Sequence, residues 1–276
     1  MRFMIKKIEV EICCGSYYDA LQAWKGGAKR IELNSALYLG GLTPSLGTLL
    51  KVKRETKLQV ICMVRPRGAG FCYDVEDFET MLEDASILLE NGADGIAFGC
   101  LNKEGRIDIK QTEQMVRLIK EYKREVVFHR AFDCVDDVDE AMKCLITLGI
   151  DRVLTSGLES KAIDGAEMLH YLQETYGDRI EILAGSGVNA ENVEDLIQRT
   201  GVIQVHSSCK GWCTDVTTSR EKVSFSYRSC GEIKNTTGNN KVQEMTDEYE
   251  VVDANLVKIL VDKVNTLNNK GNRLRD

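Results

Sequence analysis

Eight short apolar runs, each ending in a polar or glycine-rich motif, are the feature that most limits how this chain can fold. A helix-like stretch follows nearly every run. This rhythm predicts an α/β fold, a (β/α)8 TIM barrel, in which functional groups gather at the C-terminal ends of the strands. The runs expected to form strands are residues 8–13, 30–33, 58–64, 95–98, 125–129, 152–154, 180–184 and 202–206.

The length of the chain matches one such barrel with an extension. A (β/α)8 barrel takes about 250 residues, so we expect a single domain over residues 1–276. Residues 207–250 break the rhythm and are rich in polar residues, which predicts a loop-rich excursion with a flexible loop at 235–240. The last helix is expected at 251–267, where apolar residues recur at helical spacing, and residues 268–276 are expected to form a frayed polar tail.

Composition excludes several classes of protein. The formal net charge of −7 argues against a nucleic-acid partner, because such proteins usually present a basic patch. The sequence has no apolar run of about 18 residues, so we expect no membrane span. The N-terminus lacks the apolar core of a signal peptide, which predicts a cytoplasmic protein. The ten scattered cysteines are then expected to be reduced thiols.

Alternation within the first two runs places charged side chains on one face. Glu9, Glu11 and Cys13 share a face of the first run, and Arg30 and Glu32 share a face of the second, followed by an asparagine. Since the opposite faces are apolar and must pack on helices, the charged faces should point into the barrel. Glu9 and Arg30 are then candidates for a structural salt bridge. Glu11 and Glu32 would line a pocket at the mouth, with internal ion pairing as the alternative.

Further charged motifs follow the third, fifth and eighth runs. Two arginines beside a proline suit the bidentate binding of a carboxylate or phosphate. Two of the three histidines fall at predicted strand ends, whereas His170 lies in a predicted helix and is expected to be structural or exposed. The candidate ligand-binding residues from these motifs are Arg65, Arg67, Arg130, Asp133 and His206, and the candidate proton-transfer residues are Glu32 and His129.

Small residues follow the sixth and seventh runs. Ser156 lies in a Thr-Ser-Gly sequence, and Gly185, Ser186 and Gly187 form a short glycine loop. In many barrels a phosphate binds to the loops after strands seven and eight. Tight turns also favour glycine, so the loop alone is a weak signal. Together with the arginines it indicates an anionic ligand.

Several motifs resemble those of a known family, the CutC copper-homeostasis proteins. They are RIELNSALYLGGLTPSLG (30–47), VRPRGAGFCY (64–73), GADGIAFGCLNKEGRID (92–108), FHRAFD (128–133), DRVLTSG (151–157) and ILAGSGV (182–188). The resemblance spans most of residues 8–208. It implies a (β/α)8 barrel, often oligomeric, that handles copper and in some members binds Cu(I). A homo-oligomer is therefore expected.

The resemblance also implies copper ligands. Cysteines near the ends of the first two strands are the family's candidate ligands, and the first matches Cys13, with an additional thiol at Cys14. The second position is Asn34 in this chain, where many relatives have cysteine. Because Cu(I) prefers thiolates and thioethers, this departure removes one soft ligand. The substitutes that remain open are Cys14, Met63 and the pair Cys209 and Cys213.

Two functional hypotheses follow. The first is a copper homeostasis protein that binds Cu(I), supported by the resemblance and the abundant sulfur. The second is an enzyme acting on a small phosphorylated or carboxylated metabolite, supported by the carboxylates, imidazoles and guanidiniums expected at the mouth. No organic cofactor is expected. A barrel without a small-molecule function is the weakest alternative, since a scaffold gains nothing from so many charges at one end.

Overall fold

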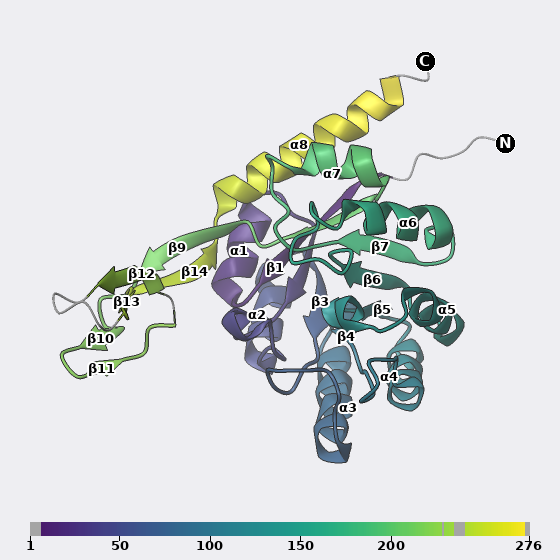
Figure 1. Cartoon of the computed structure of the whole chain (residues 1–276), viewed down its shortest axis with the longest axis horizontal. Coiled ribbons are helices and arrows are strands. Elements are labelled where there is room, and N and C mark those ends of the chain that lie inside the picture. The colour runs from purple at the N-terminus through teal and green to yellow at the C-terminus, as the bar shows by residue number, and fades with distance from the viewer. Residues whose placement is uncertain (1–6, 228, 235–240, 274–276) are drawn as a thin grey trace.

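The computed structural model describes residues 7–227, 229–234 and 241–273. Eight parallel strands close into a barrel in chain order, with helices alternating between them (Figure 1). The predicted (β/α)8 fold is therefore confirmed, and each barrel strand lies within one or two residues of its predicted run. The strands are β1 (Glu9–Cys14), β2 (Arg30–Leu33), β3 (Gln59–Met63), β4 (Gly95–Phe98), β5 (Glu125–Phe128), β6 (Arg152–Thr155), β7 (Glu181–Ala184) and β8 (Gln204–Ser207).

Most of the helices that surround the barrel begin at polar capping residues. The side chains of six of these residues accept a hydrogen bond from a backbone N–H three residues further on, namely Ser16, Ser45, Asp74, Asp108, Asp137 and Asp253. Such a cap stabilises a helix by about 1 kcal/mol. The helices are α1 (Tyr17–Lys25), α2 (Leu46–Glu55), α3 (Val75–Glu90), α4 (Ile109–Glu121), α5 (Val138–Leu148), α6 (Ala166–Tyr176), α7 (Val193–Thr200) and α8 (Ala254–Arg273), with 3-10 turns η1 (Leu37–Leu39) and η2 (Arg130–Cys134).

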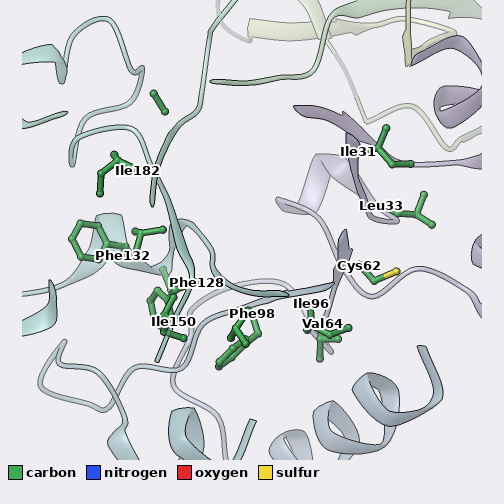
Figure 2. Packing of buried hydrophobic residues seen from close by; sticks show 14 of the residues in the cluster. Ile31, Leu33, Cys62, Val64, Ile96, Phe98, Phe128, Phe132, Ile150 and Ile182 are labelled. Atoms are coloured by element: carbon green, nitrogen blue, oxygen red, sulfur yellow. The ribbon is translucent and has the colours of Figure 1, made fainter. Parts of the chain in front are cut away.

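The two faces of the barrel strands build separate cores, as their alternation predicts. The larger core packs between the strands and the helices. Figure 2 shows part of it, with Ile31, Leu33, Cys62, Val64, Ile96, Phe98, Phe128, Phe132, Ile150 and Ile182 labelled. A smaller cluster of Ile61, Met63, Ala97 and Val127 is formed by the opposite faces. The inside of the barrel therefore contains little apolar surface, and charged groups fill much of the rest.

Charged side chains cross the interior of the barrel. The side chain of Arg152 is 1 % exposed and its Nη1 lies 3.1 Å from Oε2 of Glu11, although β6 and β1 are not neighbours. Arg152 also pairs with Glu125. Arg30 lies 3.0 Å from Glu9 and 2.8 Å from Glu11. The predicted Glu9–Arg30 salt bridge is confirmed, and Glu11 takes part in the same internal ion pairing.

Residues 208–253 are called the arm from here on, and its described residues include six short strands, whereas a loop-rich excursion was expected at 207–250. β9 (Lys210–Thr214) pairs antiparallel with β14 (Glu248–Val252). The paired strands extend away from the barrel, with the other strands of the arm at the far end (Figure 1). These are β10 (Ser219–Arg220), β11 (Val223–Ser224), β12 (Ser229–Lys234) and β13 (Lys241–Met245). The flexible loop predicted at 235–240 lies outside the described residues.

The C-terminus also differs from expectation. α8 continues to Arg273, so residues 268–273 are helical rather than a frayed tail. The side chain of Asn268 explains part of this, since it accepts a hydrogen bond from Ile8 N and donates one to Ile8 O. These bonds tie the helix to the chain just before β1. In the described part of the chain, no helix is long and apolar enough to cross a membrane.

Candidate metal centre

Cys13, Glu32 and His206 form a cluster of potential metal ligands inside the barrel. One ligand atom of each lies within 4.8 Å of the other two. Barrel closure produces this arrangement, because β1 pairs with both β2 and β8. In the register of these strands Cys13 lies beside Glu32, and Glu11 lies beside His206. Cys13 and Glu32 lie two residues nearer the C-terminal ends of their strands than Glu11 and Arg30, which pair with each other in the same register.

Glu11 connects this cluster to the ion pairs below it. Its Oε1 lies 2.9 Å from Nδ1 of His206, and its Oε2 contacts Arg30 and Arg152. Burial raises the pKa of Glu11, but Arg30, His206 and Arg152 outweigh burial and lower it to about 2. Burial also lowers the pKa of His206, yet contacts with Cys13, Glu11 and Glu32 raise it well above its ordinary value. Glu11 therefore fixes the imidazole and leaves Nε2 as the nitrogen for a ligand.

Asn34 supports two members of the cluster. Its Nδ2 donates to Oε2 of Glu32 at 2.9 Å and lies 3.6 Å from the sulfur of Cys13. Its Oδ1 is buried and has no hydrogen-bond partner within the described residues. Gly41 crosses directly over this oxygen, where an added Cβ would lie 2.4 Å from it. Asn34 thus lies beside the cluster, at the position where many relatives have a cysteine, and acts as a hydrogen-bond donor.

The other thiols proposed as ligands lie elsewhere. Cys14 is on the opposite face of β1, in the core between barrel and helices, with its sulfur 3.6 Å from Ile12 O. Cys209 belongs to that same core, and Cys213 lies on β9 of the arm. Met63 faces the smaller inner cluster and is 4 % exposed. Cys14 therefore does not join Cys13 in a two-thiol site, since neighbouring residues of a strand point to opposite faces.

Arg65 and His129 form a second group at the ends of β3 and β5. Arg65 donates to the carbonyl oxygens of Leu39, Gly41 and Ala69 at 2.8, 3.0 and 2.6 Å. Most of its donors therefore hold loops together. Its Nε is buried and has no hydrogen-bond partner among the residues described.

The imidazole of His129 is 3 % exposed and tilted against the ring of Phe71, with centroids 5.1 Å apart. Its Nδ1 accepts a hydrogen bond from Ala131 N, so a proton on the neutral ring belongs on Nε2. That nitrogen is buried with no hydrogen-bond partner within the described part of the chain. Burial, and then the charge of Arg65, lower the pKa of His129 to about 3. His129 is therefore neutral at physiological pH.

The remaining charged candidates are bound to other parts of the chain. Arg67 pairs with Asp77 at 2.6 Å and donates to the carbonyl of Cys72. Arg130 pairs with Asp133 at 2.7 Å and donates to Ser156. Asp133 in turn accepts hydrogen bonds from both the N–H and the hydroxyl of Ser156. These contacts stabilise the loops after β3, β5 and β6.

The glycine loop after β7 is also structurally constrained. Ser186 and Gly187 have φ of 80° and 71°, in the left-handed region, and the hydroxyl of Ser186 donates to Ser160 O at 2.7 Å. An added Cβ at Gly185 would lie 2.6 Å from Leu154 and 3.3 Å from His206. The absence of a side chain at Gly185 therefore leaves room for the imidazole of the cluster.

Sequence reasoning missed two features. The first is that Cys13 and His206 meet. The sequence assigned Cys13 to a metal site and His206 to an anion site, although closure of a barrel always brings the last strand beside the first. The second is that the arm returns to this place. Asp19 accepts a hydrogen bond from Val252 N at 2.8 Å, Lys210 pairs with Glu250, and these residues help to line a small cavity beside Cys13. The order of the strands around the barrel is the one sequence-derived signal that could have shown in advance that Cys13 and His206 lie side by side.

The fold and this cluster define a (β/α)8 barrel with a thiol, an imidazole and a carboxylate gathered at the end of β1, and comparison with known proteins shows which family it represents. Residues 8–211 match the sequence model of the CutC family. The chain belongs to the CutC family, as its motifs predicted. Most of the arm and α8 lie beyond the matched residues.

Individual relatives agree with this assignment. A CutC family protein of Treponema denticola is 52 % identical over 202 residues, which cover 73 % of this chain and 81 % of that protein. The copper homeostasis protein cutC homolog of the mouse is 39 % identical over 201 residues, 73 % of each chain. A structure described as CutC of Streptococcus agalactiae superposes with a TM-score of 0.69 at 32 % identity, covering 73 % of this chain and 98 % of that one. A phosphoribosylanthranilate isomerase of Pyrococcus furiosus, with a TM-score of 0.51 and 15 % identity over 94 % of this chain and 99 % of its own, shares the fold alone.

Proposed function

We propose that this CutC family chain acts in copper homeostasis by binding a copper ion at Cys13, Glu32 and His206. The observation that carries the proposal is the approach of the three ligand atoms to within 4.8 Å. The names of its relatives in mouse and human refer to copper homeostasis. A thiolate and an imidazole are both accepted copper ligands. In this role copper is the cargo of the protein.

The donor groups fit a copper ion, and the chain prepares two of them. Glu11 holds Nδ1 of His206, which directs the other ring nitrogen toward a ligand. Asn34 donates to Glu32 and so fixes that carboxylate. Cys13 contributes the one thiol of the cluster and must lose its proton when a metal binds.

The test is a copper titration of the reduced full chain against a chromophoric Cu(I) chelator, comparing the wild type with Cys13→Ser and Cys72→Ser. Cys72 is an exposed thiol away from the cluster and serves as the matched control. The tightest copper site should be lost in Cys13→Ser and retained in Cys72→Ser. Equal copper binding by the two variants would remove the proposal.

An enzyme acting on a small phosphorylated or carboxylated metabolite is the second candidate. Two buried donors without partners favour it, namely Nε of Arg65 and Nε2 of His129, both described above. A carboxylate or phosphate oxygen would satisfy either donor. In this reading His129 or Glu32 transfers the proton, and Arg65, Arg67 and the loop at 185–187 hold the anion. The wider set of candidate ligand-binding residues is Glu11, Arg65, Arg67, Arg130, Asp133, Ser156, Gly185, Ser186, Gly187 and His206. Thermal shift with a panel of such metabolites tests it, since a specific ligand raises apparent stability. A panel without a stabilising compound would argue against this candidate.

A cytoplasmic, homo-oligomeric protein is part of the proposal. The nine cysteines whose side chains are described are all free thiols, which suits a reducing compartment. Exposed apolar side chains on the arm, with Phe225 80 % and Val216 70 % exposed, are consistent with contact between copies. Light scattering of the purified chain tests the assembly, and a monomeric mass at all concentrations would contradict it.

A further inference from the structure

The donors at Cys13, Glu32 and His206 differ in chemical hardness, and this mixture bears on which metal the site takes. We propose that the cluster is a site for a divalent ion of the zinc(II) or copper(II) class, and that Glu32 sets this preference over Cu(I). The inference rests on the proposed function, because it specifies the metal for the same three residues.

The first argument is the chemistry of the ligands. Cu(I) prefers thiolates and thioethers, and the cluster offers one sulfur. Imidazole nitrogen and carboxylate oxygen are common ligands of zinc(II), which also accepts thiolate. Three protein ligands leave one position of a tetrahedral ion for an external ligand, as in sites that exchange what they bind. A divalent ion can use all three residues, whereas Cu(I) would use Cys13 and His206 and leave Glu32 aside.

The second argument is charge balance in a buried site. With a metal bound, Cys13 as thiolate and Glu32 as carboxylate contribute two negative charges, and His206 is neutral. A divalent ion cancels both charges, while Cu(I) leaves one negative charge behind. Glu32 and His206 are 3 % and 8 % exposed, and an uncompensated charge in such surroundings is costly.

The neighbouring ion pairs do not supply the missing positive charge. Arg30 and Arg152 both contact Oε2 of Glu11, at 2.8 and 3.1 Å, and each pairs with further carboxylates. Glu11 therefore neutralises positive charge of these two arginines on the side away from the cluster. Charge compensation for Glu32 and the Cys13 thiolate has to come from the metal itself.

The third argument is the role of Asn34. Its amide nitrogen donates to Glu32 and approaches the sulfur of Cys13, so an N–H group stands where a second soft ligand would be needed. Gly41 packs against its Oδ1, which holds the amide in this orientation. Asn34 therefore steadies the hard ligand of the cluster and adds no sulfur. Exchanging it for cysteine should shift the preference toward Cu(I).

The experiment measures Zn²⁺ and Cu⁺ affinities of the reduced, metal-free full chain by anaerobic competition with chelators. Co²⁺ replaces Zn²⁺ as a spectroscopic probe, because a tetrahedral ion bound to thiolate has characteristic absorption. Glu32→Gln should weaken Zn²⁺ binding by about tenfold or more, and Cu⁺ binding should stay the same or become stronger, because the variant removes the uncompensated charge. Asn34→Cys should strengthen Cu⁺ binding by about tenfold or more and change Zn²⁺ binding much less. The absorption of bound Co²⁺ should be lost in Cys13→Ser and kept in Cys72→Ser.

The outcomes separate this inference from the proposed function. If Glu32→Gln leaves Zn²⁺ binding intact, or weakens both metals equally, the divalent preference is wrong. If only Cu⁺ binding depends on Cys13, the proposed function stands and the inference falls. If neither metal depends on Cys13, both fall. Asn34→Cys provides an independent test of the metal preference, since it introduces a thiol and leaves the Glu32 carboxylate unchanged.

Discussion

Tyr227 of the arm stacks on Tyr38 of η1, with ring centroids 4.8 Å apart and ring planes 22° from parallel. The loop that contains Tyr38 also includes Leu37, which lines the cavity beside Cys13. The stack therefore joins the arm to the barrel near the candidate metal centre. Together with the hydrogen bond from Val252 N to Asp19, it fixes how the base of the arm lies on the barrel.

Tyr227→Ala should loosen the arm without unfolding the barrel. An aromatic pair of this kind contributes about 0.5–1.5 kcal/mol beyond the area it buries. The measurement is hydrogen exchange or limited proteolysis over residues 208–253, which should become faster in the variant. Phe225→Ala is the matched control, because Phe225 is 80 % exposed and its loss should change little. Equal protection in both variants would show that the stack does not hold the arm.

Arg152→Met should be among the most destabilising single substitutions in the barrel. The guanidinium is buried among Glu11, Glu125 and Glu181, and its removal leaves these carboxylates without their shared counter-charge. Breaking a buried pair in this way costs about 3–5 kcal/mol. Denaturant unfolding measures the loss. Lys120→Met, which breaks an exposed pair with Asp151, should cost less than about 1 kcal/mol, and comparable losses would contradict the prediction.

The buried His129 predicts a specific loss of stability in acid. The unfolded chain binds a proton on this residue below its ordinary pKa of 6.5, whereas the native state does so only near 3. As the pH falls from 6.5 toward 3, protonation therefore favours the unfolded state, by roughly 1.4 kcal/mol per pH unit. Above 6.5 this residue has no effect on the pH dependence.

His129→Asn tests that prediction, because an amide oxygen can replace Nδ1 as the acceptor for Ala131 N. The free energy of unfolding of the variant should fall less steeply than that of the wild type between pH 6.5 and the acid transition. His170→Asn is the control, since His170 lies in α6 and outside this group. If the free energy of unfolding depends on pH in the same way in the wild type and in His129→Asn, the buried neutral imidazole does not limit stability in acid.

Gly41→Ala should disturb the candidate metal centre through Asn34. Gly41 has φ +86°, and an added Cβ would lie 2.4 Å from Oδ1 of Asn34, so both backbone strain and a collision are introduced. We expect a loss of about 1–3 kcal/mol in stability and weaker metal binding. Gly47→Ala is the control, because Gly47 lies in α2 with open space around it and alanine there should stabilise slightly, by about 0.5 kcal/mol. A Gly41→Ala protein with unchanged stability and affinity would rule out this contact.

Local sequence patterns were sufficient for the barrel and insufficient for the arm. Each barrel strand turns apolar residues toward the helices, and β1 and β2 combine this with a charged inward face, an alternation that can be recognised within five or six residues. β9 and β14 are short and lie far apart in the sequence, and they become strands because they pair with each other across 34 or more residues. No local pattern specifies such a pairing, so the sequence predicts loops over residues 207–250.

The sequence by itself determined that Glu9, Glu11, Arg30 and Glu32 point into the barrel, since apolar neighbours must cover the opposite faces. It also identified His206 as a strand-end residue. Only the tertiary structure decided what these groups meet. Glu11 lies beside Arg152, 141 residues away, and Cys13 lies beside His206 because β8 closes on β1. Side-chain direction follows from local backbone geometry, whereas the choice of partners depends on how the whole sheet closes.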